Sequence, residues 1–385
     1  MASDQTGHRQ NVAPCIAAMN TRKRAVKVCI ISYPLVDRGG IQTVTKMVIR
    51  ALSDDPSFRL RTLPVRSGRV AKATQYLKLF VLILIGYRPM FMHAYLFQAC
   101  PARLWILRYA RSIVWCHGIE VWGRYGMQRL PSLAAASELW AVSRFTAEQL
   151  ITNWPASTIR VVPLGVACQA SKQKSESVES GNMLRLLTVS RLDSDERYKG
   201  HDLSLRALAR LRIEGIPYRF DVVGDGDDRP RLMQLADELG LGEEVIFHGE
   251  VDQYKLGSLY ANASLFLLPS QVRASQDSLW GGEGFGLVYV EAAMYGIPSI
   301  AGEFGGQTDF IDHGVTGWLV PDDESALLSL IRYLARNPAD ILLCGLQCRS
   351  RAMSEYSLAA FAGRLRFALL PPSCQEPEMS VVGDR

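Results

Sequence analysis

Residues 281–291 have the sequence GGEGFGLVYVE, in which two glutamates, Glu283 and Glu291, lie eight positions apart. They follow the apolar run LFLLPS (265–270) and a polar loop, and a helix is predicted to begin near Gly286. The order is therefore a buried strand, a glycine-rich loop and a helix. Glycine is costly in ordered structure unless the backbone must bend or approach another group closely, so the loop is predicted to belong to a binding site.

The order of strand, loop and helix recurs along the chain, where apolar, β-branched runs alternate with helical patterns. In the first half, strands are predicted at 26–32, 90–96, 112–118 and 138–143, and 159–166 closes this half. In the second half, strands are predicted at 184–192, 218–226, 244–250, 263–270 and 298–306, with helices at roughly 200–213, 229–239, 253–261, 287–296 and 324–336. This pattern predicts an α/β protein with two doubly wound, Rossmann-like domains that face a central cleft.

A length of 385 residues suits roughly two domains of about 150 residues each. The Ser-rich segment between the two series of strands has no hydrophobic periodicity and is predicted to be a linker. A last amphipathic stretch is expected to pack back on the first half. The expected division is a tail (1–24), a first domain (25–166), a linker (167–183), a second domain (184–353), a crossover helix (354–370) and a tail (371–385).

The net charge of +5 conceals a strong asymmetry between the two halves. Residues 21–165 hold 21 Lys and Arg against 6 Asp and Glu, a net charge of +15, whereas residues 166–385 have a net charge of −10. A basic first half is typical of a surface for polyanions: nucleic acid, anionic lipid or a phosphorylated acceptor. The apolar run LFVLILIG (79–86) is too short to span a membrane and is either a buried helix or a helix on a membrane surface.

The N-terminus and the cysteines indicate the compartment. No secretory signal is recognisable, because the run NVAPCIAAM is short and is interrupted by proline. The eight cysteines show no paired metal spacing, and Cys344 and Cys348 lack the further ligands that a zinc site needs. The chain is therefore expected to be cytoplasmic, with reduced cysteines.

Two cations follow the first predicted strand of the second half. In SRLDSDERYKG, Arg191 ends the strand, and Lys199 precedes a glycine that opens a helix. Two cations and a helix N-terminus favour a pyrophosphate site over two solvated charges. The backbone N–H groups of residues 286–288, at the start of another predicted helix, would add a second anion-binding helix end.

Three further motifs leave alternatives open. Gly39 and Gly40 follow the first strand, where the backbone either approaches an anion or forms an ordinary tight turn. His117 lies just past a strand end and is either functional or structural. The acidic sequences at 193–195 and 225–228 either hold a divalent cation or begin helices with acids that the helix dipole favours. We prefer the second interpretation of the acids, because the two cations can neutralise phosphates without a metal.

The two glutamates differ in their predicted surroundings. Glu291 falls in the first turns of its helix and can accept hydrogen bonds from two ribose hydroxyls. Glu283, on the glycine loop, would lie near whatever group is attached beyond the phosphates. A helix start with dipole-favoured acids is the alternative, but it does not explain the glycines around Glu283.

Together these residues resemble glycosyltransferase family 4, retaining enzymes of the GT-B fold. EGFGLVYVE resembles the E-x7-E motif of that family, SRLDSDERYKG its Arg…Lys-Gly phosphate clamp, and GGIQT its first-domain glycine loop. FLLPS, FHGEV, VVGDG, VSRFTAEQL, IRVVPLGV and GVTGWLVP occur in the family's order, so the resemblance covers nearly all of 26–366. It implies two GT-B domains, and no cofactor is expected.

The resemblance implies a role for each candidate residue. Glu283 would contact the donor sugar and steady charge at its anomeric carbon, and His117 would hydrogen-bond the donor sugar. Glu291 would bind the ribose, and the backbone near Val251 would bind the base. The remaining contacts with the donor would come from Gly39, Gly40, Arg191, Lys199, Gly284, Phe285, Gly286, Leu287 and Val288.

Some positions depart from the family pattern. Asp309 stands where the family often has Glu, and Pro163-Leu164-Gly165 replaces the usual P-N-G. The loop QVRASQDSLWGG is longer than typical. This loop and ERYKGHD are similar to those of members that build exopolysaccharide, some of which are mannosyltransferases that use GDP-mannose.

The expected activity is metal-independent transfer of a hexosyl group, with mannose from GDP-mannose as the first candidate, from a nucleotide-diphosphate sugar to a saccharide in polysaccharide biosynthesis. The α configuration would be retained. The acceptor is expected to be linked to a polyprenyl diphosphate and to be used at an anionic membrane, on the inner face of the cell membrane. No nucleic acid partner is expected, because no aromatic stacking motif accompanies the basic residues. Alternatives are a UDP-sugar donor, a soluble acceptor, or a non-catalytic protein that binds nucleotide sugars.

Overall fold

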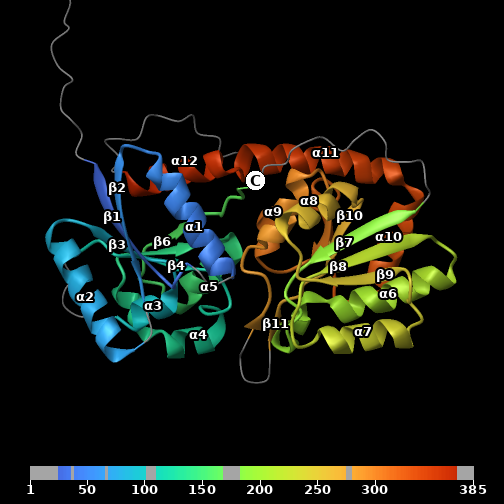
Figure 1. Ribbon diagram of the computed structural model, residues 1–385, viewed down its shortest axis with the longest axis horizontal. Coiled ribbons are helices and arrows are strands. Elements are labelled where there is room, and N and C mark those ends of the chain that lie inside the picture. Colours follow the sequence, from blue (N-terminus) through green and yellow to red (C-terminus); the bar gives the residue numbers. More distant parts are fainter. Residues whose placement is uncertain are drawn as a thin grey trace, which may run out of the picture.

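The computed structural model describes residues 25–35, 39–65, 68–100, 110–167, 183–274 and 280–370. They form two six-stranded parallel sheets that lie side by side, each with helices on its faces (Figure 1). The strand orders are β2-β1-β3-β4-β5-β6 and β14-β13-β10-β7-β8-β9. The predicted arrangement of two doubly wound α/β units is therefore confirmed.

The first sheet is built from the first half of the chain. Its strands are β1 (Val26–Ser32), β2 (Phe58–Pro64), β3 (Arg88–Phe91), β4 (Ile113–Cys116), β5 (Glu138–Ala141) and β6 (Ile159–Val161). Its helices are α1 (Gly40–Ser53), α2 (Arg69–Leu84), α3 (Ala94–Gln98), α4 (Gly123–Arg129) and α5 (Arg144–Asn153), with a 3₁₀ turn over Pro131–Ala135.

The second sheet repeats the plan. Its strands are β7 (Leu184–Val189), β8 (Tyr218–Val223), β9 (Val245–Gly249), β10 (Leu265–Leu268), β13 (Ser299–Gly302) and β14 (Gly317–Val320), and β11 (Arg273–Ala274) and β12 (Trp280–Gly281) form a separate antiparallel pair. Its helices are α6 (His201–Ile213), α7 (Arg229–Glu238), α8 (Gln253–Asn262), α9 (Leu287–Met294) and α10 (Glu324–Arg336), with 3₁₀ turns η3 (Ser194–Lys199) and η4 (Gly306–Asp309).

The strand orders locate the expected binding face. In the first sheet the order reverses between β1 and β3, and in the second it reverses between β7 and β10. Ligands of doubly wound sheets bind beyond the carboxyl ends of the strands at such switch points. The segments that follow these four strands contain Gly40, His93, Arg191 and Glu283.

One sequence prediction for the first sheet was wrong, and one strand was missed. The strand expected at 90–96 ends at Phe91, and α3 begins at Ala94, because the ring of His93 accepts a hydrogen bond from the Tyr95 backbone N–H and caps the helix. Strand β2 was not predicted. It is an edge strand with exposed Arg59 and Arg61, so the continuous apolar run of a buried strand is missing.

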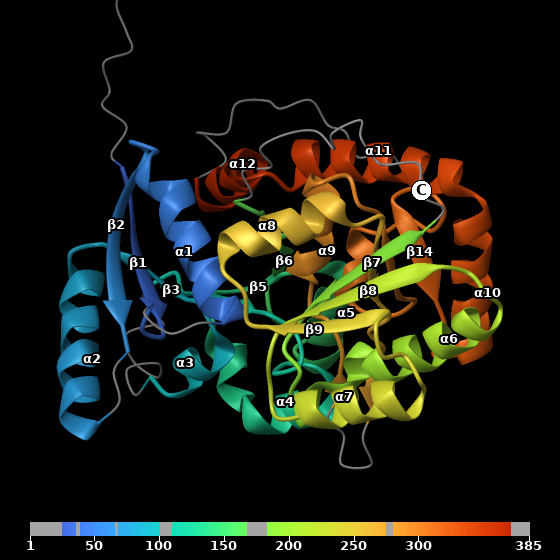
Figure 2. The same ribbon diagram turned by 45° about the vertical axis from the view of Figure 1, so that its right-hand side comes forward.

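Helices α11 (Pro338–Glu355) and α12 (Leu358–Leu369) run along one edge of the molecule, over both sheets (Figure 1, Figure 2). Helix α12 packs against α1, so the C-terminal helix lies back on the first half as expected. Phe361 is fully buried, with its ring 6.2 Å from that of Trp115. Arg364 donates to the backbone carbonyl of Pro163 at 3.1 Å and 3.2 Å.

A second contact joins the halves at the start of α5. The buried carboxylate of Asp309 in η4 accepts hydrogen bonds from the Arg144 backbone N–H at 2.7 Å and from its side-chain Nε at 3.3 Å. Arg144 is the first residue of α5, so a carboxylate from the second half neutralises a helix N-terminus of the first half. Asp309 thus has a partner here despite being one methylene shorter than Glu.

Parts of the predicted organisation lie outside the described residues. These are the two tails, 1–24 and 371–385, and the linker 167–183 except for Ala167 and Met183 at its ends. Among the helices within the described ranges, none combines the length and the apolar character that crossing a bilayer requires.

Replacing Phe361 with alanine should lower the thermal unfolding midpoint of the full chain, since emptying a buried phenylalanine site costs about 3–5 kcal/mol. Phe367→Ala is the matched control, because Phe367 is half exposed on the same helix and its truncation should lower the midpoint less. Equal midpoints for the two variants would contradict the docking of α12 described above.

Candidate functional site

Two cavities lie between the halves, at the carboxyl ends of the strands. The smaller has a volume of about 380 Å³ and is lined by residues that follow β1, β3, β4 and β7 and by the loop before α9. The larger, of about 600 Å³, lies against α1, α8 and α9. Leu287, the first residue of α9, lines both, so both cavities border the N-terminus of that helix.

The smaller cavity brings together most of the predicted site residues. It is lined by Gly40, His117, Arg191, Lys199, Glu283, Gly284, Phe285, Gly286, Leu287 and Val288, whereas Glu291 lines the larger cavity. Gly39 and Val251 are not among the lining residues of either cavity. Gly39 is the N-cap residue of α1, and Val251 packs against the core between β9 and α8.

The glycine loop is in direct contact with the loop that follows β4. A Cβ atom at Gly284 would lie 1.7 Å from the backbone oxygen of His117, and one at Gly118 would lie 2.9 Å from the Gly284 Cα. Gly286 is the N-cap residue of α9 with φ 81°, the left-handed conformation that favours glycine. The glycines therefore allow both the contact between the halves and the start of the helix.

The N-terminus of α9 opens toward the smaller cavity. Its N-cap glycine supplies no side-chain hydrogen bond, and Leu287 and Val288 in its first turn line the cavity. The first backbone N–H groups of a helix have no partner within the helix, so such an end favours an anion.

Glu283 is held in the loop between the two halves. The hydroxyl of Ser270 donates to its Oε1 at 3.4 Å, and the backbone N–H of Gly306 donates to its carbonyl at 2.7 Å. Burial raises the pKa of the Glu283 carboxyl, and the nearby positive charge of Lys199 opposes this rise. A carboxylate in such surroundings gains from any positive charge that develops in the cavity.

The predicted cations Arg191 and Lys199 both line the smaller cavity, but a carboxylate lies between them. Glu196 contacts Arg191 through Oε1, and its Oε2 lies 2.7 Å from the Lys199 Nζ. Arg191 also contacts Asp193 at 3.4 Å. The sequence predicted the cations, but it did not predict that they share Glu196.

Two acidic residues of the second acidic motif, Asp227 and Asp228, have local partners. Asp228 accepts hydrogen bonds from Arg197 and Arg231, and Asp227 accepts from the backbone N–H and the hydroxyl of Ser194. These contacts lower the pKa of Asp228 and of Asp227. Within the described part of the chain, no three His, Cys, Asp or Glu side chains are grouped so that they could hold a metal ion.

His117 lines the cavity with a defined tautomer. Its ring Nε2 lies 2.8 Å from the backbone oxygen of Met92, which can only accept, so Nε2 carries the proton and Nδ1 is an acceptor. Its backbone N–H donates to Glu120 Oε1 at 2.6 Å. Burial lowers the pKa of His117, which favours the neutral ring.

Sequence reasoning missed two residues on the same wall. His93 and Glu120 both line the smaller cavity, with His93 Nε2 3.8 Å from Glu120 Oε1. The His93 Nδ1 accepts the Tyr95 backbone N–H, so its Nε2–H can donate toward the cavity. The motif HGIE contained the signal for Glu120, three positions after His117, whereas His93 was hidden in a segment predicted to be a strand.

Glu291 lies in the larger cavity, on the second turn of α9. The hydroxyl of Tyr260 donates to its Oε2 at 3.4 Å. Burial raises the pKa of Glu291 to about 7. Hydrogen bonds donated by ligand hydroxyls would favour the ionised form and lower this pKa.

Solved structures share this fold over nearly their whole length. Sucrose-phosphate synthase from Thermosynechococcus elongatus has a TM-score of 0.68 and 21% sequence identity, over 89% of this chain and 99% of that one. Anabaena Alr3699/HepE in complex with UDP-glucose has a TM-score of 0.67 and 17% identity, with the same coverage. WaaG, a glycosyltransferase involved in lipopolysaccharide biosynthesis, has a TM-score of 0.62 and 16% identity, again over 89% and 99%. At these identities the likeness concerns the fold alone.

Curated relatives match parts of the chain. Amylovoran biosynthesis glycosyltransferase AmsK of Erwinia amylovora is 28% identical over 63% of this chain and 59% of its own length. The GDP-mannose-dependent alpha-(1-6)-phosphatidylinositol monomannoside mannosyltransferase of Mycolicibacterium smegmatis is 27% identical over 66% of this chain and 69% of its own length. The putative colanic acid biosynthesis glycosyltransferase WcaL of Salmonella typhimurium is 27% identical over 46% and 41%. The matched segments thus cover from 41% to 69% of these relatives.

A family model identifies the second half. Residues 170–345 match the model described as glycosyl transferases group 1, and this range contains Arg191, Lys199, Glu283 and Glu291. The neighbouring structures share the two-sheet architecture across both halves. The chain thus matches the group 1 glycosyltransferases over residues 170–345 and has the GT-B fold, in agreement with its resemblance to glycosyltransferase family 4.

Proposed function

We propose that this chain is a retaining, metal-independent glycosyltransferase that moves a hexosyl group from a nucleotide-diphosphate sugar to a lipid-linked saccharide. The observation that carries the proposal is the smaller cavity, where Arg191, Lys199 and the N-terminus of α9 meet Glu283 at the contact between the halves. Fixed cations and helix-end amides stabilise the negative charge that grows on a leaving diphosphate. A carboxylate beside them stabilises the positive charge that develops on the donor sugar.

The donor extends from one cavity into the other. Its diphosphate binds Arg191, Lys199 and the amides at the start of α9, and the ribose hydroxyls donate to Glu291. Support comes from Leu287, which lines both cavities, so that both border the N-terminus of α9. The base contacts the backbone near Val251, two residues before Gln253, which lines the larger cavity.

The transfer proceeds on one face of the donor sugar. The bond between the anomeric carbon and the diphosphate oxygen breaks, the acceptor oxygen forms its bond on the same face, and the acceptor proton passes to the leaving diphosphate. Glu283 stabilises the oxocarbenium-like transition state, and the His117 Nδ1 accepts a hydrogen bond from a donor-sugar hydroxyl. This assignment needs no metal, because Arg191, Lys199 and the α9 amides neutralise the diphosphate.

The acceptor hydroxyl enters from the first half. His93 and Glu120 lie on the same wall of the cavity as His117 and offer a hydrogen-bond donor and a charged acceptor. Such a pair suits a sugar hydroxyl, which both donates and accepts. Gly40, at the start of α1, leaves the cavity wall without a side chain at this point, where nothing lies within 4 Å of its Cβ position.

GDP-mannose is the first candidate for the donor. The mycobacterial relatives named for GDP-mannose are 27% to 29% identical to this chain over the matched residues. The Anabaena structures hold UDP and UDP-glucose, but their identity is 16% to 17%. A UDP-sugar is therefore the second candidate, and both are tested below.

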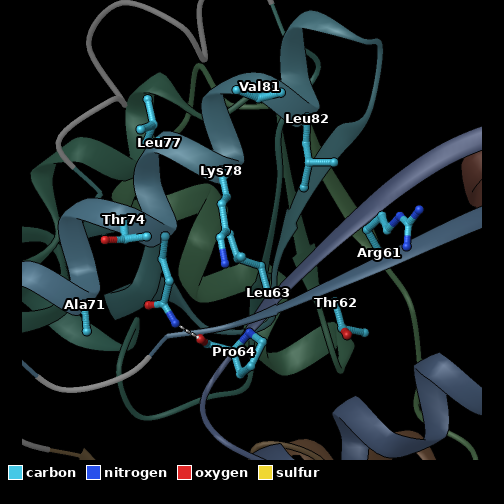
Figure 3. A pocket seen from close by; sticks show the side chains of 11 residues that line it. Arg61, Thr62, Leu63, Pro64, Ala71, Thr74, Leu77, Lys78, Val81 and Leu82 are labelled. Atoms are coloured by element: carbon cyan, nitrogen blue, oxygen red, sulfur yellow. Dashed lines mark hydrogen bonds between the residues drawn. The ribbon is translucent and has the colours of Figure 1, made fainter.

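A groove on the first half of the chain supports the proposal that the acceptor is bound to a membrane. It lies between α2 and the edge strand β2 and has a volume of about 790 Å³ (Figure 3). Leu63, Leu77, Val81 and Leu82 line it, with Lys78 among them (Figure 3). Leu79 of α2 is buried, so the helix packs against the sheet on one face and exposes apolar side chains on another. Apolar side chains beside lysines on a strongly basic half suit the surface of an anionic bilayer.

Variants of the smaller cavity test the reaction. A panel of nucleotide sugars is first screened for thermal stabilisation of the full chain, and the donor found is used for kinetics. Glu283→Gln should keep donor binding and lower kcat by about 10²–10³-fold, the usual cost of removing a group that stabilises the transition state. Arg191→Ala should raise the dissociation constant of the donor by about tenfold or more, because a charge-assisted contact is lost.

Arg206→Ala is the control for these kinetics, since Arg206 lies exposed on α6 away from both cavities. Full activity in Glu283→Gln would refute the catalytic assignment. Donor binding without transfer to any acceptor by the wild type would favour the non-catalytic alternative.

Vesicle flotation tests the membrane surface. The wild type should float with vesicles that contain phosphatidylglycerol at low salt, and Leu77→Ser/Val81→Ser should remain in the bottom fraction. Leu342→Ser/Leu346→Ser on α11 is the matched control. It removes apolar side chains that are exposed to a similar degree, since Leu346 is 63% exposed and Leu77 is 65% exposed. A wild type that does not float, or equal loss in both variants, would contradict the role of α2.

A further inference from the structure

Glu196 lies in an unexpected place beside the smaller cavity, in contact with both cations assigned to the diphosphate. Its Oε1 contacts Arg191, and its Oε2 lies 2.7 Å from the Lys199 Nζ. One carboxylate thus bridges both cations with its two oxygens, as a phosphate group would. The Glu196 side chain is 12% exposed and that of Lys199 9%, so this half of the bridge is shielded from water, whereas Arg191 is open to it.

Glu196 changes the charge balance of the cavity. Arg191 and Lys199 bring two positive charges to the cavity wall. Against them stand Glu120 and Glu283 in the wall and Glu196 in contact with both cations, three negative charges when all are ionised. Asp193, which is more exposed than Glu196, also contacts Arg191. Without a ligand, the cations are therefore already neutralised by carboxylates of the chain. A diphosphate would add further negative charge beside Glu196, where like charges shielded from water repel strongly.

We propose that Glu196 is a displaceable counter-ion that holds Arg191 and Lys199 in place while the cavity is empty and yields them to the diphosphate of the donor. This positioning role rests on the proposed function of the same site. Glu196 orients both cations before the donor arrives, and it competes with the diphosphate once the donor is bound. The competition weakens binding of the diphosphate product, which shares these contacts, and so favours its release.

The surroundings of Glu196 allow such an exchange. Arg191 is 69% exposed and can follow a ligand, whereas Lys199 is 9% exposed and stays fixed beside the cavity. Glu196 lies in η3, at the one residue of that turn recorded with non-helical backbone angles. Glu196 therefore lies at an irregular point of the turn and not within a regular helix.

A purely structural role for Glu196 predicts the opposite change in diphosphate affinity when its carboxylate is removed. If the carboxylate only kept the two side chains in position, its removal would disorder them and weaken diphosphate binding. If it also competes with the ligand, its removal leaves two cations without their counter-ion and strengthens binding. The direction of the change in affinity therefore distinguishes the two roles.

The test is calorimetric titration of the full chain with GDP and UDP, and with guanosine and uridine, which lack the phosphates. Glu196→Gln preserves the size of the side chain and removes its charge. For whichever of GDP and UDP binds the wild type more tightly, this variant should lower the dissociation constant by about tenfold. The dissociation constant of the corresponding nucleoside should be unchanged. Asp193→Asn is the matched control: it also removes a carboxylate beside Arg191, but one that does not contact Lys199, and its effect should stay within about twofold.

The variants also separate this inference from the proposed function. If neither diphosphate binds the wild type, or if Arg191→Ala leaves binding unchanged, the proposed function fails and the inference with it. If the wild type binds, Arg191→Ala weakens binding, and Glu196→Gln binds no more tightly than the wild type, the inference alone fails. Glu196→Asp provides a second variant: with the charge kept, it should bind the diphosphate less tightly than Glu196→Gln, and the reverse order would also overturn the inference.

Discussion

The site depends on one close contact between backbones. Gly284 lies so near the carbonyl of His117 that a Cβ atom would be 1.7 Å from its oxygen. No side chain of any size fits there. The contact brings the loop after β4, with His117 and Glu120, against the loop that carries Glu283 and starts α9. Groups from both sheets can therefore act on one ligand. The paired Asp309 and Arg144, and the crossover helix α12, hold the halves in the same relation.

The second constraint is electrostatic. Burial raises the pKa of Glu283 and the pKa of Glu291, so both carboxylates are costly to keep ionised without a partner. The cations nearby are themselves occupied by Glu196. Carboxylates of the chain thus neutralise the cations of the site. The proposed diphosphate would displace Glu196 from them, and ribose hydroxyls would donate to Glu291.

Much of the fold followed from the sequence, because parallel strands buried on both faces leave continuous apolar runs. Edge strand β2 broke that rule, since its alternating arginines face solvent. The glycine loop was recognisable from the sequence because clustered glycines are costly in ordered structure. The Arg191–Lys199 pair was recognisable because two cations follow one predicted strand. Glu196 and His93 were not, because what they contact depends on the turn of η3 and on the cap of α3, which only the folded chain defines.

Hydrogen exchange of the full chain with and without a saturating nucleoside diphosphate tests the central claim most directly, since it reports where the ligand lies without a mutation. Backbone amides at the start of α9 and in η3 exchange slowly only if they are bonded or shielded. Bound diphosphate should add protection over residues 191–200 and 283–292, with none over α2. Protection that avoids both segments, although the ligand binds, would contradict the placement of the diphosphate between the two halves.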